Sequence, residues 1–185
     1  TVDPEAFPFL ETMDPAYVEN YPLTDMAKAA VAAFNPLTEI PTLNCQPKGM
    51  PYAIEQPYPM EIVQLDDEIH IRMEEYNGLR IVHMGEDEMP EGEPLSLMGY
   101  STGHWQDDTL VIETSRIGYG HFSGGGIPLS DDVLVVEQFV PSEDGKSMRL
   151  NMTVTDPSSF TEPVELTKVW LALPGATVED FECIN

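Results

Sequence analysis

Hydrophobic and polar positions alternate over short blocks from residue 60 to residue 171, and turn-forming residues separate the blocks. Alternation with a period of two is typical of strands that bury one face. We therefore expect about eight short strands, drawn from nine blocks: 60–65, 68–76, 79–84, 95–100, 103–105, 109–114, 133–140, 148–155 and 164–171. Asn77-Gly78, between two such blocks, is a strong signal for a tight hairpin.

The N-terminal third follows a different pattern. Residues 24–34 predict a helix, because Thr24 can cap it and its apolar residues recur on one face. That face holds Met26, Ala30, Val31 and Phe34, and Asn35-Pro36 ends the helix. Residues 1–23 predict an extended arm that packs onto the body through Phe7, Phe9 and Tyr17. Residues 36–59 predict an irregular loop, of the kind that serves as a lid, binding loop or arm.

These elements predict one domain over residues 1–185. Its parts are the arm (1–23), the helix (24–34), the irregular loop (36–59), an antiparallel β barrel (60–175) and a C-terminal tail (176–185) tied by Cys183. The fold class is mainly β, barrel-like and loosely lipocalin-like, because closure removes exposed sheet edges. Barrels of about eight strands can hold one small ligand.

The net charge of the chain argues against some classes of function for this protein. The 185 residues include 33 acidic and 8 basic ones, a formal net charge of −25 at pH 7. A nucleic-acid partner is not expected without a basic footprint, and no apolar run is long enough to insert into a membrane. Two explanations fit the charge equally well: an ordinary acidic secreted protein, or a marine, salt-adapted source whose salt screens the repulsion. The oligomeric state is not determined by the sequence.

Two cysteines, Cys45 and Cys183, permit one disulfide or two free thiols, and we favour the disulfide. The chain begins Thr-Val-Asp-Pro-Glu, which looks like a trimmed mature product. We therefore expect an exported protein.

Several segments carry a family resemblance. MGYSTGHWQDDTLVIET (98–114) is similar to the MGxSxGxWEGDTLVVET signature of an uncharacterised group of exported bacterial β-rich proteins from sphingomonads and acidobacteria. CQPKGMP (45–51), YPMEIVQ (58–64) and FEC (181–183) resemble further motifs of that group. The resemblance implies a bacterial protein exported to the periplasm or the extracellular space, with a β-rich domain, and it fits a Cys45–Cys183 pairing. The chain departs from the group's pattern at three positions: His104 replaces a common Arg, Leu129 a common His and Gln138 a common Arg. The resemblance therefore does not imply an activity that depends on those cationic side chains.

Motifs for cofactors are absent from the sequence, and we expect neither a metal nor another cofactor. The triple glycine at 124–126 lacks the Lys and Ser or Thr of a phosphate-binding loop. A metal site of His104 and His121 with Glu113 is a minor alternative, because the two histidines flank one predicted strand.

Charged residues within strands are the better candidates for chemistry. Glu74 and Arg80 would lie near one another across a regular hairpin, either as a paired charge in a cavity or as a solvated surface pair. Glu113 and Glu137 interrupt apolar strands, so each side chain faces either water or a cavity, where its pKa would rise. Before the strand of Glu113 lie Tyr100, His104 and Trp105, which would supply a hydroxyl, an imidazole and a stacking surface to a site. The alternative is a turn whose Trp packs into the core.

Three functions remain open. The first is a binding protein that holds a partly apolar, aromatic or cyclic small molecule in the barrel, with Trp105, His121, Tyr58 and Glu137 as ligand contacts. The second is an acid/base enzyme, a lyase, isomerase or hydrolase, with catalytic residues drawn from Glu74, Arg80, Tyr100, His104 and Glu113. The third is a non-catalytic interaction protein whose interior is filled.

Overall fold

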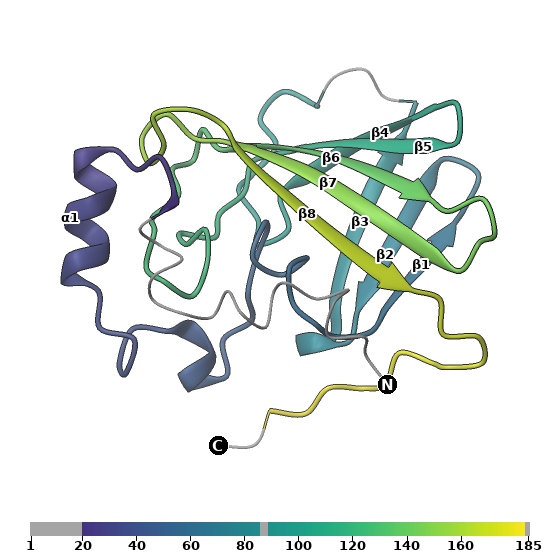
Figure 1. The fold of residues 1–185 in the computed structure, drawn as a ribbon, viewed down its shortest axis with the longest axis horizontal. Coiled ribbons are helices and arrows are strands. Elements are labelled where there is room, and N and C mark those ends of the chain that lie inside the picture. Colours follow the sequence, from purple (N-terminus) through teal and green to yellow (C-terminus); the bar gives the residue numbers. More distant parts are fainter. Residues whose placement is uncertain (1–19, 86–88, 184–185) are drawn as a thin grey trace.

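The computed structural model describes residues 20–85 and 89–183, which form one curled sheet with a short helix beside it (Figure 1). The described strands follow the chain order: β1 (Met60–Gln64), β2 (Glu68–Met73), β3 (Gly78–Met84), β4 (Tyr100–Gln106), β5 (Thr109–Ser115), β6 (Leu134–Pro141), β7 (Ser147–Thr155) and β8 (Val164–Leu171). The expected barrel-like β fold with one helix is confirmed, in the form of an open half-barrel.

Sequence neighbours pair throughout this sheet, and the pairing is antiparallel except between β3 and β4. Those two strands run parallel, with Val82 opposite Ser101, so the expectation of a purely antiparallel sheet is wrong at this point. A parallel pair needs a long connection that returns the chain to the same end of the sheet. The segment between Met84 and Tyr100 provides that connection, where a hairpin turn would not.

β1 and β8 are the two edges of the sheet, so the half-barrel has an open side. Residues 48–58 lie at this opening, and the Lys168 ammonium on β8 donates hydrogen bonds to the backbone carbonyls of Ile54, at 3.0 Å, and of Gln56. We call the region where residues 48–58 meet β1, β2 and β8 the seam. The irregular segment therefore takes the place of a closing strand.

The concave face of the sheet holds the core. Alternate side chains along each strand point to this face, because successive residues of a strand lie on opposite sides. On β6, for example, Val135, Glu137 and Phe139 are buried while Gln138 is exposed. The buried apolar residues of the strands are Ile69, Ile71, Met73, Val82, Leu110, Ile112, Val135, Phe139, Leu150, Met152, Val154 and Val164.

The predicted helix is confirmed as α1 (Asp25–Ala33), with the Thr24 hydroxyl accepting a hydrogen bond from the Ala27 backbone N–H at 3.2 Å. Ala30, Val31 and Phe34 of the predicted face are partly buried. Met26 is the exception, because it is 50% exposed while Ala27 is fully buried. Just before α1, Leu23 pairs with Phe160 in an isolated bridge. The predicted arm contacts of Phe7, Phe9 and Tyr17 lie outside the described residues.

Two strand predictions need correction. The predicted strand 68–76 ends at Met73, and a 3-10 turn, Glu75–Asn77, replaces the tight two-residue hairpin. Tyr76 and Asn77 both adopt the left-handed conformation there. The two predicted strands at 95–100 and 103–105 are instead one strand, β4, and Leu95–Gly99 precede it as a loop.

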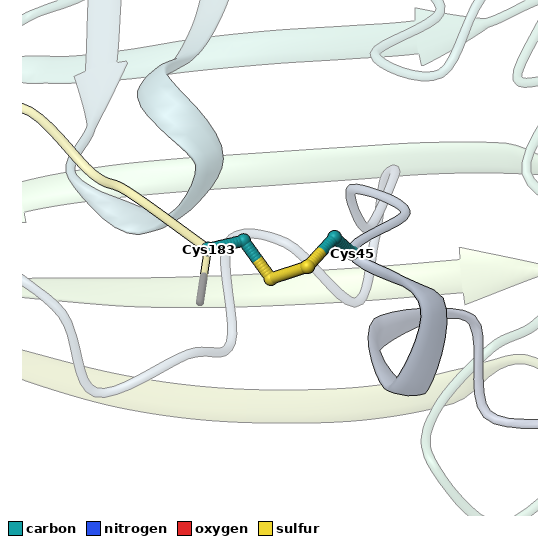
Figure 2. The surroundings of a disulfide bond; sticks show 2 residues. All are labelled: Cys45 and Cys183. Atoms are coloured by element: carbon teal, nitrogen blue, oxygen red, sulfur yellow. A yellow bond between two sulfur atoms is a disulfide. The ribbon is translucent and has the colours of Figure 1, made fainter. Parts of the chain in front are cut away.

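The Cys45–Cys183 disulfide is present and joins the tail to the end of the 3-10 turn Pro41–Asn44 (Figure 2). The two Cα atoms are 5.8 Å apart, and 138 positions of sequence separate the cysteines. The disulfide therefore fixes the tail beside the irregular segment 36–59, which continues from Cys45 into the seam. Within the described part of the chain, no helix has the length and apolar character needed to cross a membrane.

Candidate functional site

Arg80 lies at the centre of the concave face, where it is 1% exposed. Its guanidinium binds both oxygens of Glu137, with Nη1–Oε1 at 3.1 Å and Nη2–Oε2 at 2.5 Å. Two further donors reach the hydroxyls of Ser101, at 2.9 Å from Nε, and of Thr114, at 2.5 Å from Nη2. Arg80 and Glu137 thus come from β3 and β6, and the hydroxyl residues come from the two strands between them.

This four-residue centre is satisfied from within. The Ser101 and Thr114 hydroxyls also bond each other at 2.9 Å, and Glu137 is 0% exposed. A buried charge pair is tolerated only where geometry is good and further hydrogen bonds compensate the lost hydration. Both conditions hold here, so the arrangement can support the sheet without any ligand.

Glu74 does not join Arg80, contrary to the expected cross-hairpin pairing. The residue opposite Arg80 on β2 is Ile71, and Glu74 lies beyond the end of that strand. Its carboxylate instead accepts a hydrogen bond from the Glu179 backbone N–H, at 3.3 Å. The shortened strand explains the difference, because a strand continuing to residue 76 would have kept the two residues within one hairpin.

Glu113 faces solvent, which decides between the two orientations left open by the sequence. On β5 the buried positions are Leu110, Ile112 and Thr114, so Glu113 falls on the convex side. His104 is also exposed on β4, and Trp105 is 47% exposed, which excludes Trp105 as a core anchor. Among the described residues, His104, His121 and Glu113 do not gather as metal ligands, nor does any other group of three His, Cys, Asp or Glu.

Tyr100 and His121 lie in aromatic surroundings. Tyr100 is partly buried and stacks on His83, with ring centroids 4.6 Å apart. His121 contacts the rings of Phe34 and Tyr119, at 5.9 and 5.8 Å, and its buried Nδ1 lacks a hydrogen-bond partner. Burial lowers the pKa of His121 and raises that of Tyr119, so both side chains favour their uncharged forms.

The seam holds a second buried ion pair. The Lys48 ammonium lies 2.5 Å from Glu75 Oε1 and 2.6 Å from Gln56 Oε1. Both charged side chains are about nine-tenths buried, at 9% relative exposure each. The ammonium also lies 4.9 Å from the centre of the Tyr52 ring, an attractive cation–π geometry. The pair therefore joins the irregular segment to the turn after β2.

Glu55 and Lys168 form the other charged part of the seam. Burial raises the pKa of Glu55 to about 8, and the Lys168 ammonium opposes that shift. Burial also lowers the pKa of Lys168 to about 8, although the Glu55 carboxylate counteracts it. Lys168 lies 4.6 Å from the centre of the Trp170 ring. The seam thus contains an acid and a base that both titrate near neutral pH.

A small pocket opens beside these groups, and we call it the seam pocket. Its apolar walls come from the irregular segment, β1, β2 and β8, and its polar groups are Gln56, Tyr58 and Glu75; the apolar residues are Ala53, Ile54, Met60, Met73 and Trp170. Its free volume is about 10 Å³, about enough for one water molecule. Of the residues expected at a ligand site, only Tyr58 lies here.

The sequence interpretation missed Lys48, Glu55, Glu75, Lys168 and Trp170. For Lys168 and Trp170 a signal exists, because they share the period of two with Val164 on β8 and so point to the concave face. Lys48 and Glu55 belong to an irregular segment, where no periodicity indicates burial. The roles assigned from sequence to Glu74, Arg80, Tyr100, His104 and Glu113 stay predictions.

In comparisons with known proteins, the chain matches no protein-family model, no curated protein and no solved structure.

Proposed function

We propose that this chain is an exported small-molecule-binding protein whose ligand binds at the seam. The observation that carries the proposal is the seam pocket, with apolar walls that include Met60, Met73 and Trp170 and three polar groups at its side. Small-molecule sites are concave and mostly apolar, with a few polar groups that fix orientation. The centre of the half-barrel is a poorer candidate, because Arg80 and Glu137 already satisfy each other there.

The lining residues favour a partly apolar ligand with an aromatic or cyclic part. Trp170 and Tyr58 offer aromatic surfaces, and methionine side chains adapt to irregular shapes. The Glu75 carboxylate binds Lys48 through Oε1, so its second oxygen would orient a polar group of the ligand. Since the pocket holds about one water molecule, a larger ligand binds only when neighbouring segments move.

Export is supported by the disulfide, because such bonds persist in oxidising compartments. The resemblance of residues 98–114 to exported bacterial proteins agrees with it. A marine or otherwise salt-rich setting is part of the same proposal and is supported by the net charge of −25.

The test uses the two tryptophans of the chain as matched reporters. N-phenyl-1-naphthylamine, a neutral aromatic fluorophore, is titrated into Trp105→Phe, which keeps Trp170, and into Trp170→Phe, which keeps Trp105. Energy transfer from tryptophan to the bound probe should be clearly more efficient in Trp105→Phe than in Trp170→Phe. Equal transfer in the two variants, or transfer from Trp105 alone, would place the probe away from the seam and contradict the proposal.

An acid/base enzyme is the second candidate, and the pair Glu55 and Lys168 favours it. Because the pKa of each is shifted to about 8, both can exchange protons near neutral pH. A panel of aromatic, terpenoid and sugar-derived compounds would be assayed for elimination, isomerisation and hydrolysis. Any turnover should be lost in Glu55→Gln and retained in Glu113→Gln, whose carboxylate faces solvent; turnover that survives Glu55→Gln would exclude this pair.

A further inference from the structure

The C-terminal residues 179–183, which we call the tail segment, lie against the residues that flank the seam pocket. The Phe181 ring is 6.5 Å from that of Tyr58, which lines the pocket, and 4.6 Å from that of Tyr76. Tyr76 directly follows Glu75, another residue of the pocket wall. The tail segment is thus placed at the outer side of the pocket.

Asn77 holds the tail segment through its side-chain amide. The Phe181 backbone N–H donates to Asn77 Oδ1 at 2.9 Å, and Asn77 Nδ2 donates to the Phe181 carbonyl at 3.1 Å. Glu74 adds a third contact, accepting from the Glu179 backbone N–H. The turn 74–77 therefore positions Phe181 with both of its backbone polar groups engaged.

Between the end of β8 and Glu179, residues 172–178 are mostly exposed, and their hydrogen bonds are few. Segments with little burial and exposed hydrogen bonds open locally at low free-energy cost. At the far end, the disulfide from Cys183 to Cys45 limits how far the tail segment can travel (Figure 2). The arrangement has the parts of a lid: a loose connection, a specific latch and a tether.

We propose that the tail segment is a lid on the seam pocket, latched by Asn77 and tethered by the Cys45–Cys183 disulfide. The proposal rests on the proposed function, since it names what controls entry to the same site. The lid explains how a pocket that holds about one water molecule can admit a ligand: release of Phe181 frees the side formed by Tyr58 and the turn 74–77.

The experiment is made in the Trp105→Phe background, where Trp170 alone reports on the pocket. Asn77→Gly removes the latch and keeps the tether, and glycine suits the positive φ of 52° at this position. Cys45→Ser with Cys183→Ser removes the tether. Thr167→Ala is the matched control, because this exposed hydroxyl on β8 bonds the Asn151 side chain of β7, outside the tail segment and its connection. Quenching of Trp170 by acrylamide and the association rate of N-phenyl-1-naphthylamine are measured, with circular dichroism to verify folding.

Both measurements should rise at least about twofold in Asn77→Gly and in the double serine variant, as expected for a more populated open state, and stay unchanged in Thr167→Ala. Unchanged quenching in Asn77→Gly overturns the lid, even if the double serine variant shows a rise, because that rise would reflect general loosening. Probe binding with the original rate in every variant also overturns the lid but leaves the proposed function standing. Higher quenching without probe binding in any variant supports the lid and contradicts the proposed function.

Discussion

In the described part of the chain, the centre of the half-barrel and the seam both contain a buried ion pair, but they differ in backbone regularity and in what lies beside the charges. At the centre of the half-barrel, Arg80 and Glu137 come from regular strands and use their hydrogen-bonding groups on each other and on two hydroxyls. At the seam, Lys48 and Glu55 come from an irregular segment next to a pocket. Glu55 and its neighbour Lys168 have strongly shifted pKa values.

The difference supports the proposal that a ligand binds at the seam and not at the centre of the half-barrel. A fully paired charge inside a sheet contributes to a specific structure but leaves nothing for a ligand. Shifted pKa values near a concave surface are typical of functional sites. Burial of charge alone therefore does not mark a site. The seam is distinguished by the pocket beside it and by the shifted pKa values of Glu55 and Lys168.

The largest expected effect is loss of the central pair. Arg80→Met leaves the Glu137 carboxylate buried without its cation and should lower the free energy of unfolding by about 3–5 kcal/mol. Chemical denaturation measures this change. Arg80→Met combined with Glu137→Leu should recover most of the loss, because no charge is left buried. A double variant as unstable as the single one would show that the centre does more than pair its own charges.

The next largest effect is the pH dependence of stability that Glu55 and Lys168 of the seam cause. Folded Glu55 keeps its proton up to about pH 8, whereas its ordinary pKa is 4.5, so the folded state binds more protons between these values. Stability should therefore fall as pH rises through this window, by a few kcal/mol at about 1.4 kcal/mol per pKa unit. Lys168 acts in the opposite sense, because its lowered pKa makes stability rise between about pH 8 and its ordinary value of 10.5.

Glu55→Gln tests that dependence. Denaturation at a series of pH values should show a much smaller fall below pH 8 than in the unchanged protein, while Glu113→Gln keeps the original profile. A fall of the same size in Glu55→Gln would mean that other groups cause it.

A smaller loss is expected at the pair of Lys48 and Glu75. Lys48→Met should cost about 1–3 kcal/mol, because the uncompensated Glu75 lines a pocket that a water molecule can enter. The measurement is denaturation beside Arg80→Met under identical conditions. A loss as large as that of Arg80→Met would remove the contrast between the two regions.

The smallest effect is expected on the convex face. Glu113→Gln and His104→Ala change exposed side chains and should alter the free energy of unfolding by no more than about 0.5 kcal/mol. Thermal unfolding of both variants measures it. A loss of more than about 1 kcal/mol, twice that limit, would show that one of these side chains makes a stabilising contact despite its exposure.

Strand periodicity predicted much of the sheet and could have separated the two strand carboxylates. Glu137 shares the period of two with Val135 and Phe139 and is buried, whereas Glu113 alternates with Ile112 and Thr114 and is exposed. The parallel pairing of β3 and β4 could not be predicted in this way, because periodicity carries no information on strand direction.

The seam could not be predicted from the sequence, for a physical reason. Lys48 and Glu75 are brought together by the course of an irregular segment and by a 3-10 turn that replaced the expected Asn77-Gly78 hairpin. Neither feature leaves a periodic signal. The disulfide was predictable, since a chain with two cysteines allows one intramolecular pairing.

The most direct test of a ligand site at the seam is a titration of the two tryptophan indole N–H resonances by NMR. With N-phenyl-1-naphthylamine as the added probe, the Trp170 resonance should shift progressively while that of Trp105 stays in place. A shift confined to Trp105, or no shift of Trp170 at saturating probe, would contradict binding at the seam.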